Sequence, residues 1–453
     1  MANTMDMTRG KPLGLLVSFA VPIFLSSVFQ ALYAVADSAV VGQFLGVDAF
    51  AAVGAAGNVS WMVLDVILGL TQGFGILYAQ RFGAHDGPGL RRGIAMSIWL
   101  SLGLGALLTL LGILGAKPML IAIQTPEEIL PDTLTYLYWI FGGTLINTAY
   151  NVAGKLLAGL GNSRTPLLAV IVSSIFNVLL DLLIVGVLDW GVTGAAFSTV
   201  AAQLLSFLIC LWKLRSIPEV RLSKEDFRLD KGSLRELVRL GAPLGFRNGV
   251  ISVGGLFVQW AINGYGTLFV AGTTAAGKYF NLLQLVAGAL DGSFATYSAQ
   301  NYGTKNLARI RQGMRYVTAI ALVSSLATAV LTVIFGRTLI QLLVTGDAAD
   351  LEAVTQAGYE NLLVTAAGLP VLYMLYLYRS GLQGMGSTFT PTLSGFVELG
   401  LRLASVFLLP PFLGRWGIYM ANAVGWAGAF LLLCISYYHV YHKRERELGL
   451  KQT

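Results

Sequence analysis

The stretch FQALYAVADSAVVGQFLG at residues 29–46 is apolar except for one carboxylate, Asp37, near its middle. Its length and composition are typical of a transmembrane helix. A charged side chain at the centre of such a helix costs about 2.5 to 3.5 kcal/mol on insertion scales. An ionisable group that is kept at this cost is a candidate for function, so we ask which other residues would make Asp37 useful.

The composition places the chain in a membrane. Of its 453 residues, 55% are hydrophobic and 12% are charged, against about 25% charged in soluble domains. The 53 glycines suit a bundle in which helices approach closely. No segment of about 50 residues is polar enough to form a separate soluble domain. Residues 1–11 carry no cleavage site, so we expect no cleaved signal peptide.

We predict an all-α integral membrane protein with twelve transmembrane helices in two pseudo-symmetric six-helix lobes. A spanning helix needs about 20 apolar residues. The N-lobe would comprise residues 1–220 and helices 1–6, and the C-lobe residues 221–453 and helices 7–12. The expected spans are 13–42, 48–81, 93–115, 131–158, 166–187, 191–214, 237–263, 267–300, 314–336, 356–383, 391–413 and 416–441.

The basic residues indicate the orientation of these spans. Connections from odd to even spans carry Lys117, Arg337 and Arg415 and little else, whereas most other Lys and Arg residues fall on the opposite side. The positive-inside rule therefore predicts a multi-pass protein of the cell membrane with both termini in the cytoplasm. This topology accounts for the net charge of +7, and we expect no nucleic-acid partner.

The reactive side chains are few. Cys210 and Cys434 lie in apolar runs and are expected to be unpaired core residues, and the three histidines form no metal-ligand spacing. This argues against a membrane oxygenase or a zinc protease. A membrane-embedded enzyme would need a nucleophile and base or a metal set, so we expect neither an enzyme nor a cofactor.

Short motifs recur in the same order in both halves. AQRFG at 79–83 returns as AQNYG at 299–303, GLGNSRTP at 159–166 as GMGSTFTP at 384–391, and the segment ending at Pro22 as the one ending at Pro243. Similar chemistry at helix ends is the alternative explanation. Because both halves have the same orientation, we expect parallel repeats with the substrate path between them.

With these motifs the sequence resembles the MATE (multidrug and toxic compound extrusion) transporters over essentially its whole length. Further matching motifs are VADSAVVGQFLG at 35–46, AAVGAAG at 51–57, NVLLD at 177–181 and ELGLR at 398–402. The resemblance implies two six-helix lobes around a central cavity. It also implies antiport of Na⁺ or H⁺ against an organic substrate, commonly a cationic amphipathic drug.

The predicted coupling site lies in the N-lobe. Asn177 and Asp181 are four residues apart and share a helix face, and carboxylate, amide and hydroxyl oxygens are the ligands that a hard cation prefers. The resemblance assigns Asp37, Asn177, Asp181 and Thr199 to this site. Asn151, with Asn147 as its rival, would add an amide oxygen. The alternative for the amides is a hydrogen bond between helices. Either Na⁺ or H⁺ fits a buried carboxylate.

Other polar residues have weaker assignments. Pro22 is expected to act as a hinge, or to leave a static kink, on the helix that carries Asp37. Some members of the family that the sequence resembles carry membrane-embedded carboxylates on helices seven and ten. Here those two helices have Glu236 and Glu360 only near their ends, so we expect coupling through the N-lobe alone. Glu398 and Arg402 are four residues apart and are expected to pair as structure. No role is assigned to Asp65, Asp291, Arg247 or Lys278.

Substrate contacts are predicted from aromatic, Met and amide side chains, which suit an adaptable binding surface. Aromatic residues in membrane helices also serve as core or interface residues. The candidates are Gln30, Tyr33, Trp61, Tyr150, Tyr373, Met374 and Tyr376.

The function expected from these features is a secondary antiporter for a small organic molecule, acting as a monomer in the lipid bilayer. The alternative within transport is a lipid-linked oligosaccharide flippase, which would need a strongly cationic cavity. Interior residues that keep this alternative open are Lys155, Arg247, Lys278, Arg379 and Arg402.

Overall fold

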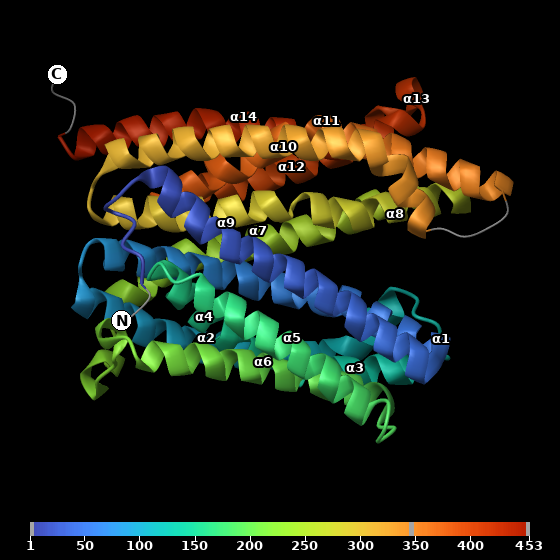
Figure 1. Cartoon of the computed structure of the whole chain (residues 1–453), viewed down its shortest axis with the longest axis horizontal. Helices are drawn as coiled ribbons and strands as arrows, with labels where there is room; N and C mark the ends of the chain where they lie inside the picture. Colours follow the sequence, from blue (N-terminus) through green and yellow to red (C-terminus); the bar gives the residue numbers. More distant parts are fainter. Residues whose placement is uncertain (1–3, 344–347, 450–453) are drawn as a thin grey trace. The chain divides into compact units, whose positions relative to one another are not determined.

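The computed structural model describes residues 4–343 and 348–449, and these residues form helices and no strand. Figure 1 shows the helices. Their bounds are α1 (Pro12–Gly83), α2 (Gly87–Ala122), α3 (Leu130–Gly142), α4 (Thr144–Gly159), α5 (Arg164–Ile184), α6 (Gly191–Arg215), η1 (Pro218–Val220), η2 (Lys224–Phe227), α7 (Lys231–Asn263), α8 (Thr267–Leu283), α9 (Leu285–Gly303), α10 (Leu307–Leu343), α11 (Ala348–Gly384), α12 (Phe389–Leu408), α13 (Pro410–Leu413) and α14 (Arg415–Glu447).

The predicted all-α membrane fold is confirmed. Eight of the described helices have the length and apolar composition to cross a membrane. The 72-residue α1 is interrupted at Gly46 (φ 87°, ψ −173°) and so supplies the first two spans. The fourth span is divided into α3 and α4 at Gly143, and the eighth into α8 and α9 at Gln284. The eleventh ends at Leu408, earlier than predicted, because Pro410 starts the separate short helix α13.

The chain forms two compact units, and each contains most of one predicted lobe. Unit 1 comprises residues up to Thr8 together with Ser18–Gly245, and unit 2 comprises Arg9–Val17 together with the residues from Phe246 on. The units therefore change inside α1 and α7, near Pro22 and Pro243, whereas the predicted boundary lies at 220/221.

The start of α1 belongs to unit 2 because its backbone is held there by side chains of the second half. The Ser293 hydroxyl donates to the Leu16 carbonyl oxygen at 2.8 Å, and the Arg309 guanidinium donates to the Gly10 carbonyl oxygen at 2.8 Å. Ser293 lies in α9 and Arg309 in α10, so residues 9–17 are anchored by partners 277 and 299 positions further along the chain.

Within unit 1, the second half of α1 crosses the start of α7 at pairs of glycines. A Cβ on Gly73 would lie 2.4 Å from the Gly241 Cα, and a Cβ on Gly69 would lie 2.5 Å from the Leu244 carbonyl oxygen. Real Cβ atoms essentially never come this close to backbone. Glycines four residues apart on both helices, at 69 and 73 and at 241 and 245, thus allow backbone-to-backbone packing.

We expect Gly73→Ala to lower the free energy of unfolding by about 1–3 kcal/mol, because the added methyl group forces the two backbones apart. Gly54→Ala is the matched control on the same helix, since no atom lies within 4 Å of its added Cβ. Thermal unfolding of both variants in detergent checks the prediction. Equal melting temperatures for the two variants would contradict the close crossing.

The repeated motifs have the same backbone geometry in both halves. Each pair shares a positive φ at the equivalent residue, in the link between two successive spans: Gly46 (87°) and Gly266 (89°), His85 (54°) and Lys305 (59°), and Gly161 (80°) and Gly386 (76°). The residue that follows His85 and the one that follows Lys305 each cap a helix. Asp86 accepts a hydrogen bond from the Gly89 N–H, and Asn306 accepts one from the Arg309 N–H. This agreement supports an internal repeat.

The first glycine of each repeated GLG or GMG motif also makes an equivalent helix contact. A Cβ on Gly159 would lie 3.1 Å from the Ala79 nitrogen, and a Cβ on Gly384 would lie 2.9 Å from the Ala299 nitrogen. The alanines belong to the AQRFG and AQNYG motifs, so each glycine motif packs against the matching alanine motif of its own half. Packing therefore explains why both motifs recur.

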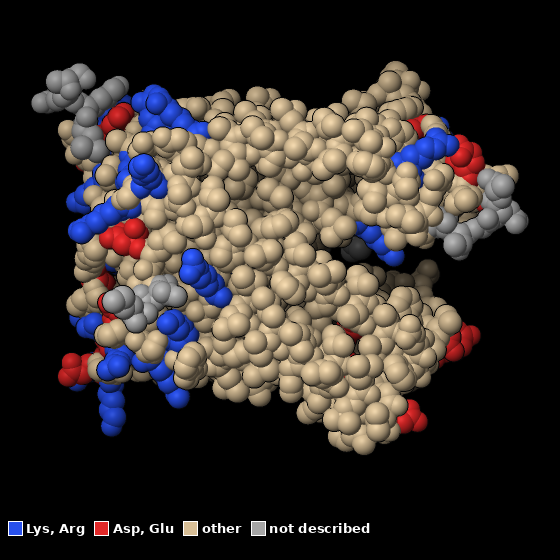
Figure 2. Space-filling view, viewed as in Figure 1, with Lys and Arg blue, Asp and Glu red and all other residues tan. Residues whose placement is uncertain are grey.

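Lys and Arg side chains gather at one end of each unit, where α1 turns into α2 and α9 turns into α10 (Figures 1 and 2). At this end Arg81 pairs with Asp86 at 2.9 Å and with Glu236 at 2.7 Å. In the connection between α6 and α7, Asp226 accepts from the Ser223 backbone N–H at 2.7 Å. This hydrogen bond lowers the pKa of Asp226 below its ordinary value, since it favours the charged carboxylate.

Candidate functional site

The candidate coupling site lies in unit 1, between the first half of α1 and α5. Asp37 on α1 is 9% exposed, and both Asn177 and Asp181 on α5 are fully buried. The carboxyl groups of Asp37 and Asp181 lie within electrostatic range of each other. Two side chains that are 144 positions apart in the chain are therefore brought together, as predicted for this site.

The polar atoms at this place are buried without protein partners. Among the described residues, Asp37 Oδ1, both amide atoms of Asn177 and both carboxylate oxygens of Asp181 have no hydrogen-bond partner. A buried polar group that lacks a partner costs free energy of roughly 1–3 kcal/mol. Two carboxylates this close repel each other unless a proton or a cation neutralises one of them. The donor set therefore fits a proton or a small cation held between α1 and α5.

The α6 helix places two hydroxyl groups beside this pair. Thr199 donates to the Ala195 carbonyl oxygen at 3.1 Å, and its hydroxyl lies within reach of the phenols of Tyr33 and Tyr136. Ser198 lies next to Asp181, although its own hydrogen bond goes to Gly194 at 2.9 Å. Thr199 thus lies at the edge of the site, where it is next to the phenols of Tyr33 and Tyr136.

Tyr33 and Tyr136 surround the carboxylates, since both phenols lie within electrostatic range of Asp37 and Asp181. Tyr33 precedes Asp37 by four residues, which puts both on one face of α1. This spacing in the sequence indicates that the two residues can belong to one site. Tyr136 comes from α3, and nothing in its sequence context marks it.

Asn151 is not brought to the carboxylates by any contact of the described residues. Its amide donates to the Asn147 backbone oxygen at 2.9 Å and to the Asn147 side-chain oxygen at 3.0 Å. The two residues that competed for one role therefore bind each other on α4. Because the contact spans a single helical turn, it satisfies the Asn151 amide locally.

Other predicted residues of unit 1 are spread over different surroundings. Pro22 is buried, and the backbone angles of α1 are helical there, since Gly46 is the only non-helical residue within α1. Its role as a hinge stays a prediction. Gln30 and Trp61 are exposed, Trp61 at 59%, whereas Tyr150 is half-buried. Within the part of the chain that the structure describes, no contact joins these three residues into one site.

The predicted substrate residues of unit 2 lie along α11. The Tyr373 hydroxyl donates to the Leu283 carbonyl oxygen at 2.8 Å, and the Tyr376 hydroxyl donates to the Gln284 side chain at 3.1 Å. Both hydrogen bonds end where α8 gives way to α9, so they hold this break against α11. Met374 is buried at 8% exposure.

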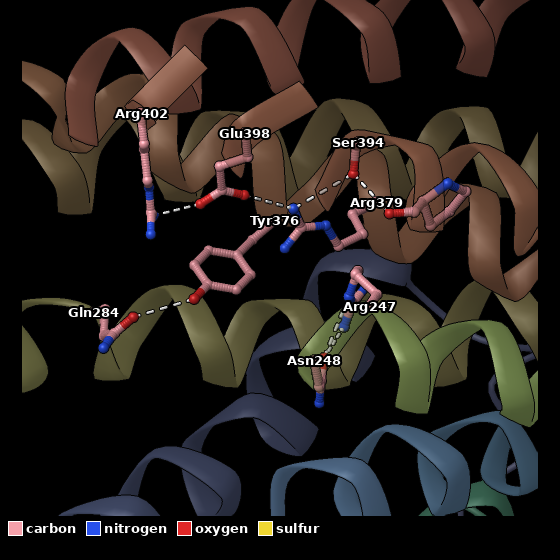
Figure 3. A network of polar contacts seen from close by, with 9 residues as sticks. Arg247, Asn248, Gln284, Tyr376, Arg379, Ser394, Glu398 and Arg402 are labelled. Atoms are coloured by element: carbon pink, nitrogen blue, oxygen red, sulfur yellow. Dashed lines mark hydrogen bonds and ion pairs between the residues drawn. The ribbon is translucent and has the colours of Figure 1, made fainter. Parts of the chain in front are cut away.

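Unit 2 also contains a buried charge network, drawn in Figure 3. The predicted pair of Glu398 and Arg402 is confirmed, at 2.5 Å. The second oxygen of Glu398 accepts from Arg379 on α11 at 3.2 Å, a contact that the sequence analysis did not anticipate. The four-residue spacing within a helix predicts the contact of Glu398 with Arg402. It cannot predict the contact with Arg379, because that contact joins different helices.

With this geometry in place, comparisons with known proteins identify the family. A model of the MatE family matches residues 22–183 and 243–408. The probable multidrug resistance protein YoeA of Bacillus subtilis is 25% identical over 451 residues, which are 96% of this chain and 95% of YoeA. YpnP of the same organism, also a probable multidrug resistance protein, is 30% identical over 340 residues, 75% of this chain and 76% of YpnP.

Solved structures show the same fold. A MATE protein in complex with MaL6 is 21% identical, with a TM-score of 0.90 over 98% of this chain and 100% of that chain. A MOP superfamily transporter from Pyrococcus furiosus is also 21% identical, with a TM-score of 0.91 over 98% and 99%. The flippase alternative finds no support in these similarities. The chain is a multi-pass membrane protein that belongs to the MatE family of multidrug efflux transporters.

Proposed function

We propose that this protein exports an organic amphipathic compound in exchange for H⁺ or Na⁺, and that Asp37 and Asp181 of unit 1 bind the coupling ion. The observation that carries the proposal is the buried pair of facing carboxylates beside the Asn177 amide, with five polar atoms that lack protein partners. The names of both Bacillus relatives, probable multidrug resistance proteins, support export of organic molecules. The resemblance to MATE transporters suggests a cationic substrate.

Ion binding at this pair would couple to conformation through charge. With a proton or Na⁺ bound, α1 and α5 can pack closely, because the repulsion between the carboxylates is neutralised. Without the ion, that repulsion favours separation of the two helices or entry of water. An ion that binds one packing more tightly than the other shifts the population between them, which is what exchange requires.

The orientation follows from the basic ends of the units. Lys and Arg side chains gather at one end of each unit, where α1 turns into α2 and where α9 turns into α10, and the positive-inside rule assigns such loops to the cytoplasm. Both termini would then be cytoplasmic, and the protein would act as a monomer with the bilayer as its partner.

The test is transport in proteoliposomes that contain the purified full-length chain and a fluorescent organic cation such as ethidium. A sodium gradient and a pH gradient are imposed in separate experiments, so that each ion is tested alone. We expect one of the two gradients to drive ethidium against its concentration gradient. The ion of that gradient is then the coupling ion. Ethidium movement equal to that of protein-free liposomes under both gradients would overturn the proposed function for organic cations.

A further inference from the structure

The buried network of unit 2 contains more positive than negative charge. Three arginines, Arg247 on α7, Arg379 on α11 and Arg402 on α12, are within range of two carboxylates, Glu398 and Asp291. Three positive charges minus two negative charges leave +1. A net charge inside a membrane protein is costly unless a ligand of opposite sign neutralises it.

Both oxygens of Glu398 are already occupied, one by Arg402 at 2.5 Å and the other by Arg379 at 3.2 Å. Asp291 acts through its charge on Arg247 and on Tyr376. The carboxylates therefore balance part of the positive charge, and Arg247 and Arg379 remain within electrostatic range of each other.

Arg247 differs from the other two arginines because the contacts of the described residues give it no ion pair with Glu398, which pairs with both Arg379 and Arg402. It is 6% exposed, and its Nε and Nη2 donate only to the side chain of the next residue, Asn248, at 3.3 and 2.8 Å. Its Nη1, like the Nε of Arg379, is buried and has no hydrogen-bond partner among the described residues. These two guanidinium nitrogens can therefore each donate a hydrogen bond to an acceptor on a ligand.

The surrounding helices are shaped for these arginines. A Cβ on Gly395 of α12 would lie 2.6 Å from the Arg247 Cγ, and a Cβ on Gly425 of α14 would lie 2.9 Å from the Arg402 Cγ. Each long side chain therefore passes over a glycine on an adjacent helix. The ring of Tyr376 lies 5.9 Å from the Arg379 guanidinium and forms an aromatic neighbour to the cluster (Figure 3).

We propose that Arg247 and Arg379 bind an anionic group of the transported molecule, of the carboxylate class. This inference rests on the proposed function, and it refines the substrate from a simple cation to an amphipathic molecule that also carries a negative group. The planar fork of arginine suits a carboxylate, because two N–H groups can donate to its two oxygens. Tyr376 would face the apolar or aromatic part of the same molecule.

The experiment compares two forms of one dye, a xanthene with a free carboxylate and the methyl ester of that xanthene. Proteoliposomes of neutral lipid are loaded with each dye, and export is measured for the wild type and for Arg247→Gln. Because a hydrogen bond to a charged group is lost, we expect the acid-to-ester export ratio to fall about tenfold or more in the variant. Arg337→Gln, which alters an arginine exposed at 44%, is the matched control and should keep the wild-type ratio.

Arg247→Lys adds a second test, because it keeps the charge but removes the fork. An intermediate ratio supports carboxylate binding. An unchanged ratio in Arg247→Gln, or an equal loss for both dyes, overturns the proposal and leaves Arg247 a structural residue. Restoration of the wild-type ratio only when anionic lipid is added would also overturn it, since the acceptor would then be a lipid headgroup phosphate.

Equilibrium binding separates this proposal from the proposed function. The two dyes are titrated into detergent-solubilised protein with no ion gradient, by fluorescence anisotropy. Tighter binding of the acid than of the ester by the wild type, with the difference lost in Arg247→Gln, supports the anion site even if neither gradient drives export. Equal affinity of the wild type for the two dyes refutes it even if export is gradient-driven.

Discussion

Asp37→Asn is expected to reduce gradient-driven export to the level of protein-free liposomes. The substitution keeps the shape of the side chain but removes one of the two neighbouring charges. With a single carboxylate left, there is no repulsion for a proton or Na⁺ to neutralise, and ion binding no longer distinguishes the two helix packings. Transport in proteoliposomes and substrate binding in detergent are measured on the same preparation.

Binding of the organic substrate should persist in Asp37→Asn, since the variant changes the ion site alone. Asp48→Asn is the control, because this carboxylate lies on the same helix α1 but is exposed. It should transport like the wild type. Full gradient-driven export by Asp37→Asn would show that the coupling ion binds elsewhere.

Glu398→Gln is expected to lower the free energy of unfolding by about 3–5 kcal/mol, the usual cost of removing one partner from a buried ion pair. Glu398 is 5% exposed and is the carboxylate that contacts both Arg379 and Arg402. Glutamine keeps one acceptor oxygen but no charge, so both guanidinium groups lose their counter-ion. The loss of stability is measured as the decrease in the midpoint of thermal unfolding in detergent. Size-exclusion chromatography monitors the unfolding.

The control for this prediction is Glu352→Gln. Glu352 also pairs with an arginine, Arg337, but it is 58% exposed, and exposed pairs contribute about 0–1 kcal/mol. The double variant Glu398→Met with Arg379→Met should recover part of the stability, because it removes both partners instead of one. Similar melting temperatures for Glu398→Gln and Glu352→Gln would show that the buried network contributes little.

The helical fold and the shared face of Asn177 and Asp181 were predictable from local rules, whereas the grouping of Asp37 with them came from the resemblance to the MATE family. Apolar length sets each span, and the four-residue spacing of Asn177 and Asp181 puts them on one face. The same spacing predicted the pair of Glu398 and Arg402, which the structure contains at 2.5 Å. The cost of a carboxylate in a membrane is what singled out Asp37.

Contacts between different helices could not be predicted, because the sequence does not show which helix faces meet. Tyr136 lies beside the carboxylates although it comes from α3, and Arg379 binds Glu398 from another helix. Neither contact has a fixed separation in sequence. Asn151 shows the converse, because an amide that was expected to reach the site binds Asn147 one turn away.

The glycine crossings show the same division. The amino-acid sequence alone establishes that glycines recur four residues apart at Gly69 and Gly73 and again at Gly241 and Gly245. Only tertiary packing selects each pair as the partner of the other, so closely that a Cβ added to Gly73 would lie 2.4 Å from the Gly241 Cα. The physical reason is that helix periodicity is a property of neighbouring residues, whereas the choice of partner depends on how all the side chains of a unit fill space together.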